Sequence, residues 1–311
     1  MKVTIVGAGN VGATCAKVLA NYEIADEILL IDIKKGLAEG KALDMWETSP
    51  ILLYDTKTSG HTGDYSKTYD SEVVVITSGV PRSPGMSRDD LVSINAKIVK
   101  EVTEQVIRYS PRAKIIVVSN PLDVMTYTSY LTAKIPAKRI FGMAGVLDAA
   151  RLKSFIALEL NVSPKEINSV LLGGHGDTMV PLPRYTTVGG IPITELMSDG
   201  QINAIVDRTI NGGAEIVNLI GTSAWYAPGA AAALMVETIL RNQRRILPIS
   251  CWLQGEYGLQ DIYFGVPAVL GKNGVEEIIE LQLTKKEMEL VKHSAKAVKN
   301  VQKILDDMKL F

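Results

Sequence analysis

The sequence is poor in the residues that build disulfide frameworks and metal centres. Among 311 residues it has two cysteines, Cys15 and Cys251, and only three histidines. Two cysteines cannot form a disulfide framework, so we expect a reducing compartment. The chain contains neither a C-x-x-C nor an H-E-x-x-H pattern, and its histidines do not cluster. We therefore predict no metal site.

Excess charge and long apolar runs are also lacking. The chain has 33 basic and 34 acidic side chains and a net charge of −1, which gives no attraction for nucleic acid or an anionic membrane. No apolar stretch approaches the roughly 20 residues that span a bilayer. After Met1-Lys2 the sequence passes directly into a strand-like run, without the apolar region and cleavage site of a signal peptide. We expect a cytoplasmic protein with no nucleic-acid or membrane partner.

The N-terminal segment carries a dinucleotide-binding pattern. The run Lys2–Val6 leads into Gly7-Ala8-Gly9-Asn10-Val11-Gly12, a helical pattern follows, and a second strand, Glu27–Ile31, ends at Asp32. The glycines of such a G-x-G-x-x-G pattern permit a tight turn, close approach to a pyrophosphate and close helix–strand packing. Asp32 would accept hydrogen bonds from the adenosine ribose hydroxyls and would repel a 2′-phosphate. The alternative is a glycine-rich turn beside a surface aspartate, but the full arrangement favours an NAD site.

Strands and helices alternate through the first half of the chain. Strand-like runs at Glu72–Thr77 and Lys114–Ser119 flank a helical pattern with apolar residues at every third or fourth position. Those residues are Leu91, Ile94, Ile98, Val102 and Val106. The alternation predicts a Rossmann-type doubly wound parallel sheet, whose ligands bind beyond the carboxyl ends of the strands.

Two segments at those ends carry polar groups. The loop Ser78–Asp90 contains Arg82 and Arg88 with two prolines and a central glycine, a composition that suits a closing lid. Guanidinium groups bind carboxylates well, although two solvated surface arginines are the alternative. Asn120 could hydrogen-bond a substrate hydroxyl or the nicotinamide ribose. It could also cap a helix with Pro121 at the first position, and both roles can hold.

The organisation changes near residue 145. We predict an NAD-binding domain at residues 1–145 and an α+β domain for substrate binding and oligomerisation at residues 146–311. A helix from Gly145 to about Leu160 carries Asp148 and Arg151 on one face, either as a surface ion pair or as two site residues. The other predicted elements are a capped helix start at Ser163, strands Ile167–Leu172, Pro183–Val188 and Ile191–Ile193, a helix at about Asp199–Ile220 with a kink or close packing site at Gly212-Gly213, an alanine-rich helix to about Leu240, antiparallel strands Arg245–Trp252 and Asp261–Pro267, and a capped final helix from Thr284.

His175 stands out because glycines flank it in Gly173-Gly174-His175-Gly176-Asp177. Glycines leave an imidazole uncovered and let the backbone approach a ligand. Imidazole is also suited to proton exchange near neutral pH. A flexible loop with an incidental histidine is the alternative that this segment alone leaves open.

Five blocks of the sequence resemble the lactate/malate dehydrogenase family, in register along essentially the whole chain. They are GAGNVG, VPRSPGMSRDDL, VSNPLDVMTY, GVLDAARL and GGHGDTMVPL. Within the family, the chain is most similar to the malate dehydrogenase branch of the lactate-dehydrogenase-like type. The resemblance implies an NAD-dependent oxidoreductase of the tricarboxylic acid cycle that forms a homo-oligomer, with a tetramer favoured over a dimer.

The resemblance also implies roles for individual residues. His175 would be the acid/base and Asp148 the carboxylate that orients it. Arg151 would bind the substrate's C1 carboxylate, Arg88 the reacting oxygen as the lid closes, and Arg82 the second carboxylate. Asn120 would bind the reacting hydroxyl, and Ser223 would line the substrate pocket. The implied cofactor-binding residues are Gly7, Ala8, Gly9, Asn10, Val11, Gly12, Asp32, Ser78, Gly79, Asn95, Val118, Ser119 and Asn120.

Arg82 decides the expected substrate. In the lactate branch of the family the matching position is typically a neutral glutamine, whereas a dicarboxylate needs a second cation. Without a carboxylate partner, Arg82 would be an unpaired charge in a closed pocket. We therefore predict malate and oxaloacetate, with lactate and pyruvate as the alternative. A non-catalytic NAD sensor and an interaction protein on the same scaffold are further alternatives, which predict no turnover and no response to NADH, respectively.

Overall fold

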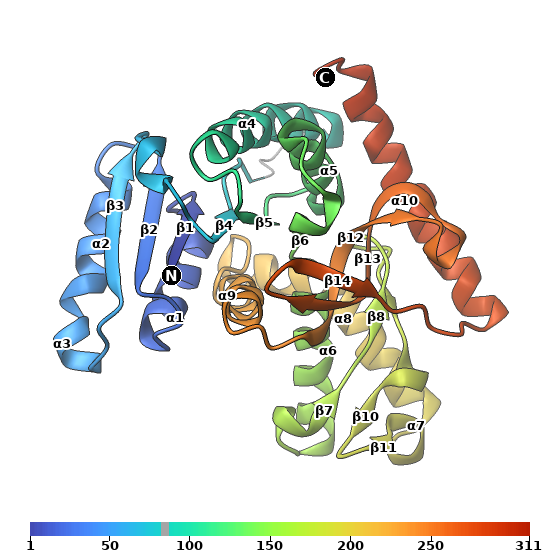
Figure 1. The fold of residues 1–311 in the computed structure, drawn as a ribbon. Helices are drawn as coiled ribbons and strands as arrows, with labels where there is room; N and C mark the ends of the chain where they lie inside the picture. The colour runs from blue at the N-terminus through green and yellow to red at the C-terminus, as the bar shows by residue number, and fades with distance from the viewer. Residues whose placement is uncertain (82–86) are drawn as a thin grey trace.

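The computed structural model describes residues 1–81 and 87–311, and its backbone is built around one large sheet (Figure 1). Six parallel strands lie in the order β3-β2-β1-β4-β5-β6. Val3 of the central strand β1 pairs with Ile28 on one side and Val73 on the other. The strands are β1 (Lys2–Val6), β2 (Glu27–Asp32), β3 (Lys57–Thr62), β4 (Val73–Ile76), β5 (Lys114–Val117) and β6 (Ile140–Gly142). This order is that of a doubly wound Rossmann sheet, which confirms the predicted fold class.

Two hydrophobic cores lie on opposite faces of this sheet. Successive strand residues point to opposite faces, so Ile28 and Leu30 enter one core while Leu29 and Ile31 enter the other. Helices α1 and α9 (Tyr226–Leu240) cover the first face, and α4 and α5 cover the second (Figure 1). The helices of the first half are α1 (Asn10–Asn21), α2 (Leu37–Glu47), α3 (Ser49–Leu52), α4 (Arg88–Tyr109) and α5 (Leu122–Ala133), with 3-10 turns η1 (Tyr65–Thr68) and η2 (Ala137–Arg139).

Two details of α4 and α5 differ from the sequence predictions. Ile94 is 38% exposed, because the buried side of α4 includes Val92 and Val99 rather than the face on which Ile94 lies. Helix α5 begins at Leu122, so Pro121 is its N-cap residue and not its first helical residue. Asn120 therefore does not cap this helix.

The sheet continues beyond the parallel strands. Gly142 of β6 pairs with Ser250 of β12 (Arg245–Gln254), and β13 (Gln260–Gly271) and β14 (Gly274–Ile278) follow in antiparallel order. The predicted antiparallel pair is confirmed. Its attachment to the N-terminal sheet was not predicted. The domain boundary near residue 145 stays a prediction, and helix α6 (Gly145–Leu160) begins there.

Four predicted elements between residues 163 and 193 are wrong in part. Ser163 precedes only a single 3-10 turn, η3 (Pro164–Glu166), because the chain then enters a strand. The strand expected at 167–172 is divided, because β7 pairs with β10 whereas β8 pairs with β9. The first half of the strand expected at 183–188 is a 3-10 turn, and Ile193 begins a helix. The observed elements are β7 (Ile167–Asn168), β8 (Leu171–Leu172), β9 (Val180–Pro181), η4 (Pro183–Tyr185), β10 (Thr187–Val188), β11 (Ile191–Pro192) and α7 (Ile193–Leu196).

Three longer helices complete the C-terminal half: α8 (Asp199–Ile220), α9 (Tyr226–Leu240) and α10 (Lys285–Asp307), with the 3-10 turn η5 (Glu256–Gly258) between β12 and β13. Helix α10 packs against α4, α5 and β13, and so joins both halves of the chain. Within the described residues, every helix is too short or too polar to cross a membrane.

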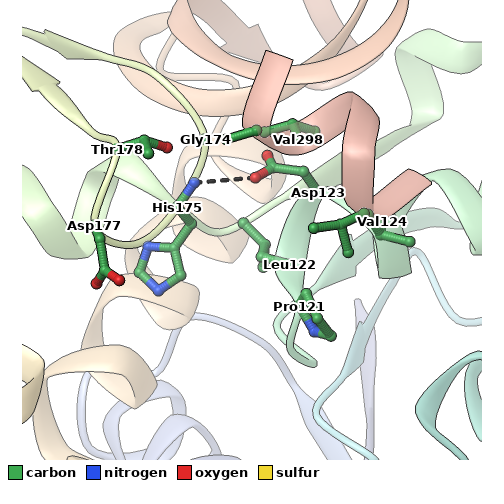
Figure 2. Close-up of a pocket in the computed structure, with 11 residues that line it drawn as sticks. Pro121, Leu122, Asp123, Val124, Gly174, His175, Asp177, Thr178 and Val298 are labelled. Carbon is green, nitrogen blue, oxygen red and sulfur yellow. Dashed lines mark hydrogen bonds between the residues drawn. The ribbon is translucent and has the colours of Figure 1, made fainter. Parts of the chain in front are cut away.

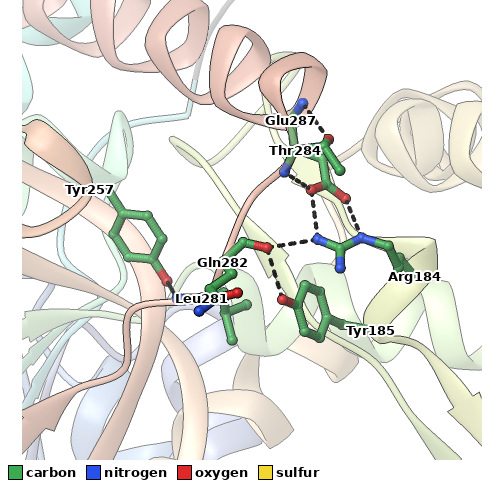
Figure 3. Close-up of polar contacts among 7 residues, drawn as sticks. All are labelled: Arg184, Tyr185, Tyr257, Leu281, Gln282, Thr284 and Glu287. Atoms are coloured by element: carbon green, nitrogen blue, oxygen red, sulfur yellow. Dashed lines mark hydrogen bonds and ion pairs between the residues drawn. The ribbon is translucent and has the colours of Figure 1, made fainter.

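Figure 3 shows how the start of α10 is anchored. Thr284 and Glu287 form the predicted capping box. Arg184 donates to the Glu287 carboxylate at 2.9 Å and to the carbonyl oxygen of Gln282 at 2.8 Å. The Tyr185 hydroxyl donates to the same carbonyl at 3.0 Å. The hydrogen bond from Arg184 is the main cause that lowers the pKa of Glu287.

Candidate active site

The glycine-rich loop between β1 and α1 has the form that a pyrophosphate requires. Gly7 has a φ of 107°, and a Cβ atom on Gly12 would lie 1.9 Å from the carbonyl oxygen of Gly7. A Cβ atom on Gly9, by contrast, would meet no protein atom within 4 Å. The Asp32 carboxylate accepts a hydrogen bond from the Ala8 N–H at 2.7 Å and so fixes the loop. Backbone N–H groups at the start of α1 therefore face a space that suits an anion.

A groove of about 370 Å³ is lined by this loop and by the ends of β4 and β5. The predicted cofactor-binding residues that line it are Gly9, Asn10, Val11, Gly12, Gly79, Asn95, Val118, Ser119 and Asn120. Four others, Gly7, Ala8, Asp32 and Ser78, are not in the lining. The carbonyl oxygen of Ser78 accepts a hydrogen bond from the Ser119 hydroxyl at 2.5 Å. The cofactor contacts of all these residues stay predictions.

Asn95 is engaged in a way that its sequence position did not indicate. Its amide nitrogen donates to the carbonyl oxygen of Asn120 at 2.7 Å, and its amide oxygen accepts from the Val80 N–H at 2.8 Å. The side chain is buried, with 1% of the residue exposed. Asn95 therefore joins the start of the predicted lid to Asn120.

His175, Asp148 and Arg151 form a connected group on α6 and the loop after β8. The Nδ1–H of His175 donates to Asp148 Oδ2 at 2.9 Å, and Arg151 Nη1 donates to Asp148 Oδ1 at 3.2 Å. The Asp148 side chain is only 1% exposed, whereas those of His175 and Arg151 are 17% and 15% exposed. The spacing of three residues on one helix gives Asp148 and Arg151 this contact. Because Nδ1 is taken, Nε2 is the imidazole nitrogen left for proton exchange.

The surroundings of the imidazole favour its charged form. Burial lowers the pKa of His175, but the charge and hydrogen bond of Asp148 and the charge of Asp123 raise it. Arg151 lowers it by a smaller amount, and the net pKa lies above the ordinary histidine value. The raised pKa favours the imidazolium, which is the form of a histidine that can donate a proton.

The guanidinium of Arg151 has a donor left for a ligand. Its Nε is buried and has no hydrogen-bond partner among the residues that the structure describes. An unpaired buried donor of this kind fits a carboxylate. Helix α8 makes room for the side chain at Gly212, where a Cβ atom would lie 3.1 Å from Arg151 Cδ. The glycine pair predicted as a kink or packing site is thus a packing site at Gly212.

A second cavity, of about 340 Å³, contains the predicted substrate residues Asn120, Arg151, His175 and Ser223. Its walls share Val11, Val118, Asn120, Ser223 and Ala224 with the groove beside the glycine-rich loop. The two spaces are therefore adjacent. Arg82 lies outside the described residues, and so does the side chain of Arg88, so their predicted roles stay predictions.

Sequence reasoning missed the residues behind the histidine loop. Figure 2 shows Asp123 of α5, whose carboxylate accepts a hydrogen bond from the His175 backbone N–H at 3.0 Å. The hydroxyl oxygen of Ser294 on α10 accepts from the N–H of the preceding residue, Gly174, also at 3.0 Å. An acid within the apolar stretch Leu122–Met125 was the only signal that pointed to Asp123.

Comparison with known families assigns both halves of the chain. The NAD-binding domain of lactate/malate dehydrogenases matches residues 1–142, and the alpha/beta C-terminal domain of the same enzymes matches residues 145–307. The chain belongs to the lactate/malate dehydrogenase family. Membership confirms the resemblance seen in the motifs, the NAD cofactor and the expectation of an NAD-dependent oxidoreductase.

Individual relatives narrow the comparison. The chain is 64% identical to a malate dehydrogenase of Cytophaga hutchinsonii over 99% of both chains, and 56% identical to one of Salinibacter ruber over 99% of this chain and 97% of that one. The solved malate dehydrogenase structure from Salinibacter ruber superposes with a TM-score of 0.95 at 53% identity, over 99% of both chains. A Cryptosporidium parvum lactate dehydrogenase, solved with lactic acid and NAD, superposes with a TM-score of 0.94 at 37% identity over 98% of both chains. Fold alone therefore does not separate the two activities.

Proposed function

We propose that this protein is an NAD-dependent malate dehydrogenase, which reversibly oxidises (S)-malate to oxaloacetate. One observation carries the proposal. A half-buried imidazole, ordered by a buried carboxylate, shares a cavity with a guanidinium whose Nε has no hydrogen-bond partner in the described part of the chain, and that cavity adjoins the dinucleotide groove. The high identity to named malate dehydrogenases supports the choice of substrate.

His175 performs the proton transfer in this proposal. In the oxidation of malate, its neutral Nε2 takes the proton of the C2 hydroxyl. Asp148 holds the Nδ1–H and stabilises the imidazolium that forms. In the reverse direction, His175 must carry that proton before oxaloacetate reacts. Asn120, on the same wall, would donate to the reacting oxygen.

The groove beside the glycine-rich loop would hold NAD, the redox partner of the substrate. When bound there, NAD⁺ provides the acceptor for the hydride that leaves C2 of malate. The start of α1 would bind the pyrophosphate and Asp32 the adenosine ribose. Asp32 already accepts two backbone hydrogen bonds, from Ala8 and from Lys34, one on each oxygen, and a carboxylate has further lone pairs for ribose hydroxyls.

Two arginines would hold the ends of the substrate. Arg151 Nε is the buried donor available to the C1 carboxylate. Arg82, on the predicted lid, would hold the second carboxylate, and Arg88 would stabilise charge on the reacting oxygen. Exclusion of water by a closed lid would strengthen each of these interactions.

The test of the proposal is kinetic. Substitution of His175 by asparagine is expected to lower turnover in both directions by at least about a hundredfold, because an amide cannot take up and release the proton as an imidazole does. Binding of NADH is expected to persist. Near-native turnover of His175→Asn would contradict the assignment. Faster reduction of pyruvate than of oxaloacetate by the wild type would instead favour lactate dehydrogenase.

We further propose that the protein is a cytoplasmic homo-oligomer, with a tetramer favoured over a dimer, and that it acts in the tricarboxylic acid cycle. Apolar side chains support contact between copies, since Ile51, Leu53, Leu219 and Tyr226 are between 73% and 84% exposed. Light scattering on the purified protein tests this. A monomer at micromolar concentration would contradict it.

A further inference from the structure

Asp123 is a buried carboxylate that the proposed mechanism does not use. It lies on α5, and 5% of the residue is exposed. Its Oδ2 accepts from the His175 backbone N–H at 3.0 Å, and its Oδ1 accepts from the Ser250 hydroxyl at 2.7 Å. Both donors are neutral. Burial raises the pKa of Asp123, while its hydrogen bonds from Ser250 and His175 lower it by less.

Burial of a charged carboxylate at this position costs desolvation free energy, which other interactions of the charge must offset. An asparagine could bond both groups without a charge, since its oxygen would accept from the His175 N–H and its NH2 group would donate to the Ser250 hydroxyl, which can also accept, at a smaller desolvation cost. Hydrogen bonding to these two groups therefore does not explain why a negatively charged side chain is buried here. The negative charge of Asp123 acts on the imidazole of His175, because it raises the pKa of that ring.

The loop that carries His175 is held by two consecutive backbone N–H groups. The N–H of Gly174 donates to Ser294 Oγ on α10. The N–H of His175 donates to Asp123 on α5 (Figure 2). Gly174 is wedged in place, because a Cβ atom there would lie 2.4 Å from Val298 and 3.3 Å from Asp123 Oδ2. The backbone of the loop is thus fixed from behind, while Asp148 fixes the imidazole from the side.

Among the residues whose side chains the structure describes, four charged groups lie around the imidazole. Asp148 and Arg151 come from α6, Asp123 comes from α5, and the exposed Asp177 follows on the same loop. Arg151 opposes the imidazolium, and Asp148 favours it through direct contact. Asp123 is the one that combines a charge with a hold on the backbone of the histidine itself.

We propose that Asp123 is a positioning residue for His175: its carboxylate fixes the backbone at the histidine and its negative charge favours the imidazolium. This rests on the proposed role of His175 as the acid/base. It extends that role, because two carboxylates from different helices then share the control of one imidazole.

The experiment compares the wild type with Asp123→Asn and Ser294→Ala. Asparagine keeps the size of the side chain and an acceptor for the His175 N–H, but removes the charge. Ser294→Ala removes the hydrogen bond to the neighbouring Gly174 N–H without a change of charge, and so is the matched control. Thermal unfolding checks that each variant is folded.

The pH dependence of both directions is the first readout. For Asp123→Asn, the alkaline limb of oxaloacetate reduction and the acid limb of malate oxidation both move to lower pH. Reduction at about pH 8 is expected to fall about tenfold or more in kcat/KM, because less of His175 carries its proton. Ser294→Ala is expected to lower kcat and to leave both limbs in place. A loss of rate in Asp123→Asn with both limbs unmoved would overturn the proposal.

Proton NMR of the histidine rings gives a second readout that needs no turnover. The chain has three histidines, and the resonance of His175 is the one that disappears in His175→Asn. It is expected to titrate at lower pH in Asp123→Asn than in the wild type, and an unchanged titration would refute the inference. If the wild type failed to reduce oxaloacetate, the proposed function would fall, but this titration would still test Asp123.

If Asp123→Asn does not fold, Ser250→Ala still tests the effect of the Asp123 charge on His175. Loss of the Ser250 hydrogen bond raises the pKa of Asp123 further, because that bond lowers it. The protonated form of Asp123 is thereby favoured, and the His175 resonance is expected to titrate at lower pH than in the wild type, by a smaller amount than in Asp123→Asn. A shift to higher pH would contradict the proposal.

Discussion

Replacement of Asp148 by asparagine tests the proposed acid/base most sharply. Both oxygens of Asp148 accept hydrogen bonds, one from His175 Nδ1–H at 2.9 Å and one from Arg151 Nη1 at 3.2 Å. An asparagine has a single acceptor oxygen, so its NH2 group must face one of these two donors. If it faces His175, the imidazole takes the tautomer with the proton on Nε2 and cannot accept another from malate.

The magnitude follows from the geometry. With the imidazolium and carboxylate charges about 4 Å apart and an effective dielectric constant of about 20, the attraction is about 4 kcal/mol. At about 1.4 kcal/mol per tenfold change, loss of this attraction lowers the rate about a thousandfold. The alkaline limb of oxaloacetate reduction is also expected to move to lower pH, because the charge and hydrogen bond of Asp148 raise the pKa of His175.

The assay is the change in NADH absorbance with oxaloacetate, over a range of pH. Glu159→Gln is the matched control, since it removes an acid from the same helix. The observed hydrogen-bond partner of Glu159 is Gln201, which is not part of the His175 group. NADH binding, followed by fluorescence, is expected to be similar in both variants. If Asp148→Asn kept turnover within tenfold of the wild type, the reasoning would be refuted.

Three further predictions concern substrate, stability and cofactor. Gly212→Ala is expected to raise KM for oxaloacetate several-fold, because the added Cβ would displace the Arg151 side chain. Gly213→Ala should change KM less, because its Cβ would lie 3.7 Å from the same guanidinium. Equal effects of the two substitutions would argue against a packing role for Gly212. Glu287→Gln is expected to lower the melting temperature at pH 7 but not near pH 3. The native pKa of Glu287 lies below its unfolded value, so its contribution is present above the ordinary carboxyl pKa and is lost as the pH falls; a pH-independent effect would contradict this. NADPH is expected to be used at least about a hundredfold less well than NADH in kcat/KM, and Asp32→Asn should narrow that gap because it removes the charge that repels a 2′-phosphate.

The parts of the fold that depend on local pattern could be predicted from the sequence. The glycine-rich turn, the strands around it and the capping box at Thr284 depend on residues within a few positions of one another, and all are present. The group of His175, Asp148 and Arg151 was also predictable, because two members lie three apart on one helix and the third is marked by its glycines.

Other features depend on contacts that sequence spacing does not reveal. Asp123 and Ser294 lie 52 and 120 residues from the backbone groups that they hold, so only the folded chain brings them together. The exposed Ile94 shows a second limit. Two overlapping apolar stripes run along α4, and burial against the sheet selects the one that contains Val92 and Val99. The divided strand after η3 shows a third, since its two halves differ in partner rather than in composition.

The most direct test of the whole account is the rate of NADH oxidation with oxaloacetate and with pyruvate, measured side by side on the wild type and Arg82→Gln. The account predicts that the wild type prefers oxaloacetate at least about a thousandfold in kcat/KM, which corresponds to about 4 kcal/mol, and that Arg82→Gln shifts activity toward pyruvate. A wild type that reduces pyruvate as well as oxaloacetate, or an Arg82→Gln variant with unchanged preference, would contradict it.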